Sequence, residues 1–197
     1  MKIGILALQG DFLEHQQILQ NLGVETIQVR LPAQLEGLDG LIIPGGESTT
    51  IGKLAHDFGL IEPLKQFGRE HAVWGTCAGA ILLAKDIQRK QPLLGLMDIR
   101  VARNAFGRQV DSFEVALKVP FLNNFGLNGK LFNAVFIRAP IIAEVYGRAE
   151  VILALDDGTI VAARQNNLLA TSFHPELSGD DRFHRYFLEL IKSQSER

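Results

Sequence analysis

The amino-acid sequence predicts an α/β fold in which helices cover both faces of a mostly parallel sheet. In the first half of the chain, short β-rich apolar runs alternate with helical patterns, and this order is typical of parallel sheets. Hydrophobic residues make up 47% of the 197 residues, which is enough for a sizeable core without disulfides or metals. One domain is the default at this length, so we expect a single domain over residues 1–197.

Each element of the first half has its own local signal. The run at 3–8 is apolar throughout, as in a buried strand, and 24–29 and 38–43 are further strand candidates. Pro44-Gly45-Gly46 closes the third run, and Ser48 is expected to cap the helix that follows. We expect helices at 11–22, 48–58 and 77–84, and a fourth strand at 72–75.

The second half is richer in short strands. Asp156-Asp157-Gly158 and Gln165-Asn166-Asn167 are good turn sequences between three of them. A helical pattern at 180–192 follows the last strand. The expected strands lie at 99–102, 113–119, 131–137, 151–155, 159–163 and 168–172.

Charge and cysteine content exclude several classes of protein. The formal net charge is -2, and lysine and arginine are scattered, which argues against nucleic acid or an anionic membrane as a partner. No stretch approaches the about 20 apolar residues that span a bilayer, and the apolar run at the N-terminus is too short for a signal peptide. Cys77 is the only cysteine, so a reducing compartment, the cytoplasm, is expected.

The most specific motif is Gly75-Thr76-Cys77-Ala78-Gly79, between an expected strand and an expected helix. A nucleophile on so sharp a turn is exposed above the edge of the sheet, and glycines flank it because Cβ atoms would clash. The N-terminus of the following helix would stabilise a thiolate and later an oxyanion. The alternative is a cysteine that serves as a small core residue.

A thiol nucleophile needs a base, and His174 is the best candidate. It follows an apolar strand, and Pro175 restricts it to extended conformations. Glu176 lies two residues on, where an extended chain would point it the same way as the imidazole. An ordinary turn at the end of a strand is the alternative. The other histidines stand in polar, helical or helix-flanking context and are expected to be solvated: His15, His56, His71 and His184.

A third motif, Pro44-Gly45-Gly46-Glu47-Ser48-Thr49-Thr50, offers backbone N–H groups to an anion, although many α/β proteins have such a turn. Together the motifs closely resemble those of the class I (triad) glutamine amidotransferases. Within that class they resemble the glutaminase subunits of pyridoxal 5'-phosphate synthases. The matching segments are Leu8-Gln9-Gly10 with Glu14-His15, Pro44 to Thr50, Gly75 to Gly79, Arg103-Asn104-Ala105-Phe106-Gly107-Arg108-Gln109, Phe136-Ile137-Arg138-Ala139-Pro140 and Ser172-Phe173-His174-Pro175-Glu176-Leu177.

The resemblance implies a three-layer, flavodoxin-like sandwich and a set of site residues. It implies a triad of Cys77, His174 and Glu176, with backbone oxyanion donors at Gly46 and Ala78. It also implies that the glutamine site is lined by Gly46, Glu47, Ser48, Arg103, Ile137 and Arg138. An arginine can grip the α-carboxylate of glutamine, and Glu47 or a carbonyl can accept its α-ammonium group. Without the resemblance, Arg103 and Arg138 would be interpreted as members of surface ion pairs.

The implied reaction is hydrolysis of L-glutamine to L-glutamate and ammonia, with the ammonia passed to a partner synthase subunit that makes pyridoxal 5'-phosphate. It requires no metal or bound cofactor. Three alternatives stay open: a glutaminase that serves another synthase, a catalytically idle binding protein of the same fold, and a cysteine peptidase or chaperone-like relative. Residues 120–130 form a longer segment than expected for this family, and we expect a surface loop there, away from the triad.

Overall fold

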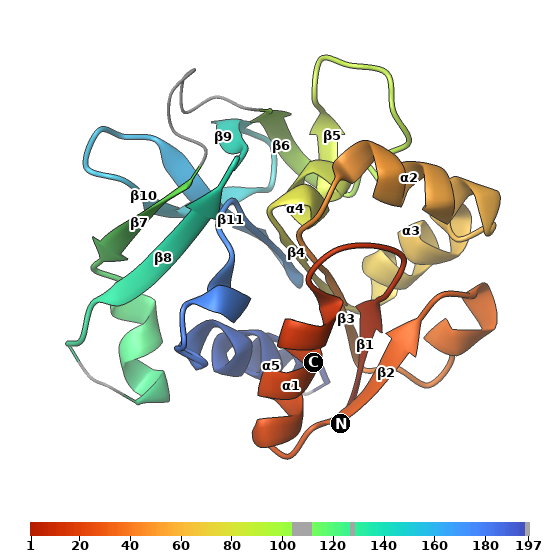
Figure 1. The fold of residues 1–197 in the computed structure, drawn as a ribbon, viewed down its shortest axis with the longest axis horizontal. Helices are drawn as coiled ribbons and strands as arrows, with labels where there is room; N and C mark the ends of the chain where they lie inside the picture. Colours follow the sequence, from red (N-terminus) through yellow and green to blue (C-terminus); the bar gives the residue numbers. More distant parts are fainter. Residues whose placement is uncertain (104–111, 127–128, 196–197) are drawn as a thin grey trace.

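The computed structural model describes residues 1–103, 112–126 and 129–195. Within these residues a ten-stranded sheet has the order β2-β1-β3-β4-β12-β11-β9-β6-β5, with β10 paired to β11 (Figure 1). Its strands are β1 (Lys2–Leu6), β2 (Glu25–Val29), β3 (Gly40–Ile43), β4 (Ala72–Thr76), β5 (Ala84–Asp86), β6 (Met97–Ala102), β9 (Ile141–Val145), β10 (Glu150–Ala154), β11 (Ile160–Gln165) and β12 (Leu168–Thr171).

The part of the sheet that carries the site is parallel. Strands β2, β1, β3, β4 and β12 pair in parallel throughout, whereas β11 pairs antiparallel with β12, β10 and β9, and β9 antiparallel with β6. The predicted α/β class is therefore confirmed, with an antiparallel extension on one side. Parallel neighbours end at the same edge, so the loops after β3, β4 and β12 meet there.

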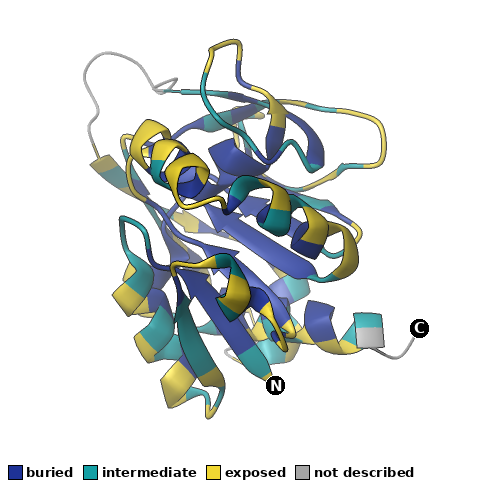
Figure 2. Ribbon diagram, turned by 90° about the vertical axis from the view of Figure 1, so that its right-hand side faces the viewer, coloured by how far each residue is buried: buried dark blue, intermediate teal, exposed yellow. Residues whose placement is uncertain are grey.

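Helices cover both faces of this sheet (Figure 2). On β4, Val73 belongs to one buried cluster and the next residue, Trp74, to the other, because successive side chains of a strand point to opposite faces. The helices on the Val73 face are α2 (Ser48–Asp57), α3 (Ile61–Glu70) and α4 (Ala78–Leu83), and those on the Trp74 face are α1 (Phe12–Asn21) and α5 (Arg182–Ser195).

A two-stranded antiparallel sheet, β7 (Ser112–Leu117) and β8 (Phe132–Ile137), adds to the Trp74 face. The 3₁₀ helix η2 (Pro120–Phe125) connects its strands. The rings of Phe121 and Phe125 pack on Tyr186 of α5, and Leu122 is fully buried. The expected surface loop at 120–130 is thus partly a packed helix, while residues 127–128 lie outside the described part of the chain.

Besides the short 3₁₀ helices, one α-helix and two strands of the described residues were not predicted. Helix α3 carries Pro63, which the first turn of a helix tolerates because its N–H has no intrahelical partner there. The short strand β9 follows Pro140, and β5 has only three residues, so neither shows the alternation of apolar and polar residues that predicts a strand. No helix among the described residues combines the length and the apolar character that crossing a membrane requires.

Candidate active site

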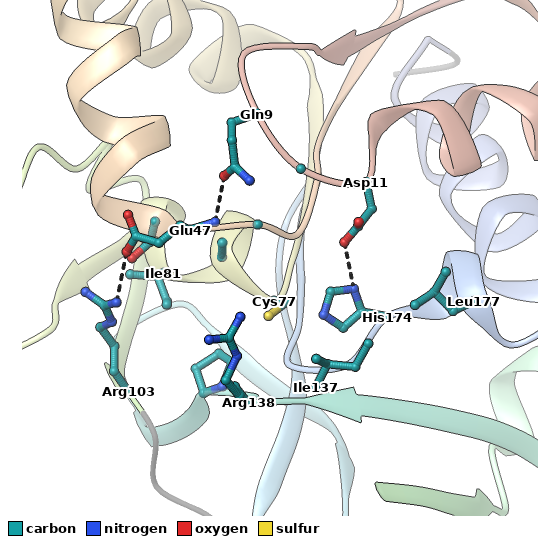
Figure 3. A pocket seen from close by; sticks show the side chains of 15 residues that line it. Gln9, Asp11, Glu47, Cys77, Ile81, Arg103, Ile137, Arg138, His174 and Leu177 are labelled. Carbon is teal, nitrogen blue, oxygen red and sulfur yellow. Dashed lines mark hydrogen bonds and ion pairs between the residues drawn. The ribbon is translucent and has the colours of Figure 1, made fainter. Parts of the chain in front are cut away.

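A pocket of about 420 Å³ opens at the carboxyl ends of β3, β4 and β12 (Figure 3). The side chains of Cys77, Arg138 and His174 point toward the same space in this view. The lining residues are Gln9, Gly10, Asp11, Gly46, Glu47, Ser48, Cys77, Ala78, Ile81, Arg103, Ile137, Arg138, Pro140, His174 and Leu177. All the residues expected from the sequence to bind substrate, or to act on it directly, therefore line one pocket, and Glu176 lies behind it.

Cys77 occupies a strained turn between β4 and α4. Its φ of 47° lies in the left-handed region, which costs a residue with a Cβ atom about 1–3 kcal/mol. A Cβ on Gly75 would lie 2.5 Å from the backbone of Gly79, and one on Gly79 would lie 2.0 Å from the carbonyl oxygen of Ile43. The two glycines are therefore required by close packing of the elbow, as expected from the sequence.

The His174 imidazole is held from behind by Glu176. Nδ1 of His174 lies 2.7 Å from Oε1 of Glu176, so Nδ1 carries a proton and donates a hydrogen bond to the carboxylate. The expected contact is present, but the expected extended geometry is wrong. Pro175–Leu177 form a 3₁₀ turn, η3, and this turn folds the glutamate back against the ring.

Asp11 is a second carboxylate at the same imidazole, and sequence reasoning missed it. Its Oδ2 lies 3.3 Å from Nδ1 of His174, and its backbone N–H donates to the carbonyl oxygen of Gly45. Asp11 stands at the start of α1 and more than 160 residues from His174 along the chain, so no local pattern connects the two.

These carboxylates set the charge of the imidazole. Burial lowers the pKa of His174, but interactions with Asp11, Cys77 and Glu176 raise it by more, and the net pKa lies above its ordinary value. Burial raises the pKa of Glu176, but the charge of His15 and hydrogen bonds with His15 and His174 lower it by more. The site therefore favours an imidazolium beside an ionised Glu176.

The loop after β3 lies against His174 and the loop after β1. A Cβ on Gly45 would lie 2.4 Å from the His174 ring, and one on Gly46, whose φ is 151°, would lie 2.6 Å from Oε1 of Gln9. That same Gln9 oxygen accepts from the backbone N–H of Glu47 at 2.7 Å. Only glycine fits at both positions, because the loop after β3 packs so closely against His174 and the loop after β1.

The predicted cap of α2 was wrong by one residue. Glu47 is the cap, and its carboxylate accepts from the backbone N–H groups of Thr49 and Thr50 at 3.2 and 2.7 Å. Ser48 is the first helical residue and is buried. Burial raises the pKa of Glu47, but the hydrogen bonds of Thr49 and Thr50 lower it by more, to about 2.

Two arginines border the pocket, as the sequence led us to expect. Arg103 donates from Nη2 to Oε1 of Glu47 at 3.1 Å, so it does belong to an ion pair, although one inside the pocket. Arg138 has a φ of 42°, a second strained position beside Cys77. The matching segment at 104–109 that follows Arg103 lies outside the described residues.

Two of the histidines expected to be solvated are fully buried. His15 on α1 and His184 on α5 have 0% exposure and meet beneath the carboxyl end of β4. The polar neighbours of His15 concealed its position, but Leu19 stands four residues on, on the same buried face of α1. His184 similarly lies next to Phe183 and three residues before Phe187, both buried.

The fold and this pocket define a glutamine amidotransferase. A solved structure described as a glutamine amidotransferase superposes with a TM-score of 0.89 at 50% identity, over 96% of this chain and 98% of that chain. The chain belongs to the SNO glutamine amidotransferase family, whose model matches residues 5–193.

Two further comparisons give one relative of high sequence identity and one solved structure of low sequence identity. The pyridoxal 5'-phosphate synthase subunit PdxT of Herpetosiphon aurantiacus is 60% identical over 195 residues, which cover 96% of this chain and all of that protein. A putative GMP synthase subunit from Thermoplasma acidophilum has a TM-score of 0.71 at 18% identity, over 100% of this chain and 96% of that chain. The second similarity concerns the fold alone.

Proposed function

We propose that this chain is the glutaminase subunit of a pyridoxal 5'-phosphate synthase. It hydrolyses L-glutamine to L-glutamate and ammonia and delivers the ammonia to a synthase subunit. The observation that carries the proposal is that Cys77 and His174 line one pocket, with Glu176 held against the His174 ring from behind. The naming of a 60% identical relative as a subunit of this synthase supports the choice of partner.

Cys77, His174 and Glu176 form the catalytic triad in this proposal. The Cys77 thiolate attacks the side-chain carbonyl carbon of glutamine, and the bond to nitrogen breaks as His174 gives its proton to the leaving ammonia. His174 then takes a proton from water, which attacks the γ-glutamyl thioester and releases glutamate and the thiolate. Glu176 supports the imidazolium through both steps.

The tetrahedral oxyanion is held by the backbone N–H groups of Gly46 and Ala78. Ala78 is the first residue of α4 and follows the nucleophile directly, so its N–H has no partner within the helix. Gly46 reaches the same space from the loop after β3. Because one donor begins helix α4 and the other lies on a separate loop, a movement of the Gly46 loop alone can complete the oxyanion site.

Glutamine is gripped by the charged rim of the pocket. Arg103 and Arg138 offer guanidinium groups to the α-carboxylate, and Glu47 offers a carboxylate to the α-ammonium group. Ser48 and Ile137 complete the wall. The volume of about 420 Å³ lies within the ordinary range for pockets that bind small molecules.

The reaction is assigned to side chains alone, without metal or cofactor. Ligand atoms of Asp11, His174 and Glu176 lie within 4.8 Å of one another, a spacing that a metal site also has. Here both carboxylates approach the same ring nitrogen, which gives them a role in holding the imidazole. Because its single cysteine is not in a disulfide, we assign the enzyme to the reducing cytoplasm.

Reconstitution tests this function. The chain is mixed with a pyridoxal 5'-phosphate synthase subunit, sugar phosphates and glutamine labelled with ¹⁵N in the amide. We expect ¹⁵N in pyridoxal phosphate and one glutamate per ammonia, and we expect a glutamine-analogue electrophile to label Cys77. Cys77→Ser should abolish both products, and added ammonium should restore pyridoxal phosphate.

Retained glutamine hydrolysis in Cys77→Ser would overturn the triad. Glutamine hydrolysis only with a different synthase, identified by pull-down, would overturn the assignment of the partner. No hydrolysis with any partner would favour the idle binding protein.

A further inference from the structure

Glu176 is enclosed between two imidazoles, only one of which belongs to the proposed triad. Its Oε1 lies 2.7 Å from Nδ1 of His174, and its Oε2 lies 3.2 Å from Nε2 of His15. The side chains of Glu176 and His15 both have 0% exposure. His15 belongs to α1, which packs directly against η3.

The tautomer of His15 follows from its neighbours. An ionised carboxylate only accepts, so Nε2 of His15 must carry a proton toward Glu176. This N–H makes its hydrogen bond to the hydroxyl oxygen of Thr76, which accepts at 3.3 Å, so its 3.2 Å contact with Oε2 of Glu176 is a close electrostatic contact and not an aligned hydrogen bond. The assignment holds whether His15 is neutral or charged, because both forms can carry the Nε2 proton.

His184 completes the arrangement from α5. Its Nε2 lies 2.9 Å from Nδ1 of His15. Burial, followed by the charge of His15, lowers the pKa of His184 well below its ordinary value, so His184 is neutral. A neutral His184 can donate to a neutral His15 or accept from a charged one. Either way it fixes the ring of His15, and Trp74 packs edge-on against both rings.

We propose that His15 is a positioning residue for the triad: its Nε2–H, 3.2 Å from Oε2, supports the negative charge of Glu176 and keeps the carboxylate aimed at His174. This inference rests on the proposed function. Oε2 of Glu176 is buried and makes no aligned hydrogen bond within the described part of the chain, so the stability of its charge depends on the nearby Nε2–H of His15. Without His15, Glu176 would take up a proton at a higher pH and would then cease to support the His174 imidazolium.

The titratable groups around this pair come from every neighbouring element. His174 and Asp11 face it from the pocket, His184 from α5, and Cys77 lies beyond His174. The titratable groups that contact His15 directly are Glu176 and His184, so a change in pH dependence after substitution of His15 is expected to act through these two groups first. Variants must separate these two contacts.

Replacing His15 with glutamine or with asparagine separates the contact with Glu176 from the contact with His184, because the two amides have similar polarity but different reach. In His15→Gln the amide nitrogen replaces Nε2 and reaches Glu176, whereas in His15→Asn it replaces Nδ1 and faces His184. With the synthase present, we expect His15→Asn to lower kcat about 10- to 100-fold, the range that a close contact between an N–H group and a buried charge can supply. KM should stay unchanged, and the acid limb of the pH profile should move to higher pH. His15→Gln should behave nearly as the parent.

A second readout does not require glutamine turnover. Cys77 is the only cysteine, so iodoacetamide alkylation reports directly on the thiolate–imidazolium pair. We expect its pH midpoint to rise in His15→Asn and in Glu176→Gln, with no further rise in the double variant. His71→Leu, which alters a histidine stacked on Phe67 outside the pocket, should leave the midpoint unchanged.

Equal behaviour of the Gln and Asn variants, an unmoved midpoint or an additive double variant would each overturn the positioning role. If the midpoint moves but no synthase elicits glutamine hydrolysis, the glutaminase assignment falls while the support of Glu176 by His15 stands.

Discussion

Arg103 donates to Glu47 at 3.1 Å, and this ion pair ties the end of β6 to the N-terminus of α2 inside the pocket. The guanidinium has further N–H groups, one of which lies 3.4 Å from the side-chain oxygen of Gln91. Arg103 can therefore hold Glu47 and still present donors to a substrate carboxylate, because its fork carries five N–H donors.

The first prediction concerns substrate affinity. Arg103→Ala and Arg138→Ala should each raise KM for glutamine about 10- to 100-fold with little change in kcat, because they grip the substrate equally along the reaction. Steady-state glutamate release measures both constants. Arg100→Ala, which removes an arginine of β6 paired with Glu144 outside the pocket, is the control and should leave KM unchanged. A loss of kcat alone would assign Arg103 and Arg138 to the transition state.

The second prediction ranks the members of the triad. His174→Asn should lower kcat by at least about 10²-fold, since it removes both base and acid. Glu176→Gln should cost less, because an amide keeps a hydrogen bond to Nδ1 but not the charge that supports imidazolium. Single-turnover rates would separate the two. Full activity in both variants would leave the Cys77 elbow with a structural role only.

The third prediction concerns acid stability. The folded pKa of Glu47 is lowered to about 2 from an ordinary 4.5, so its stabilising effect is present above about pH 4.5 and is lost as the pH falls toward 2. Glu47→Gln should lower the free energy of unfolding by about 1 kcal/mol at pH 7, and this difference should shrink by pH 3.

Thermal unfolding across this pH range measures the effect. Glu62→Gln, in the first turn of α3 and paired with Lys65 at the surface, is the control and should show little difference at any pH. A difference for Glu47→Gln that is constant from pH 7 to pH 3 would mean that its carboxylate charge does not stabilise α2.

The fourth prediction concerns activation by the synthase. The peptide between Gly45 and Gly46 can turn its N–H toward the oxyanion or away from it at little steric cost. Loss of one oxyanion donor costs about 10²–10³ in rate, so kcat should rise well above tenfold when the synthase binds. Gly46→Ala should blunt this rise, because its Cβ would meet Gln9 at 2.6 Å.

Glutamate release at saturating glutamine, with and without the synthase, checks this. Gly59→Ala changes another glycine of positive φ, but one with open space around it, so activation should persist. Equal rates with and without the synthase would show that the oxyanion site is complete in the isolated chain.

The sequence predicted the parts of the fold that depend on local patterns, and it missed contacts made across the sheet. The role of Cys77 could be predicted because glycines two residues before and after it indicate a sterically tight turn. The contacts of His15 and Asp11 could not be predicted, because they arise only when η3 packs beside α1. The wrong cap at Ser48 has a different cause: Glu47 also caps well when its carboxylate reaches Thr49 and Thr50, and propensity ranks serine above it.

Strands β3, β4 and β12 are neighbours in the sheet, so the assembly of the site depends on this adjacency and not on the order of the strands along the chain. Three loops converge because three strands are adjacent, although β12 comes some ninety residues after β4. Ile191, near the end of α5, packs on Gly40, which pairs with Ile3 of the first strand. A circular permutant, with a linker across this end and new termini in the β10–β11 turn, should therefore keep all three loops in place.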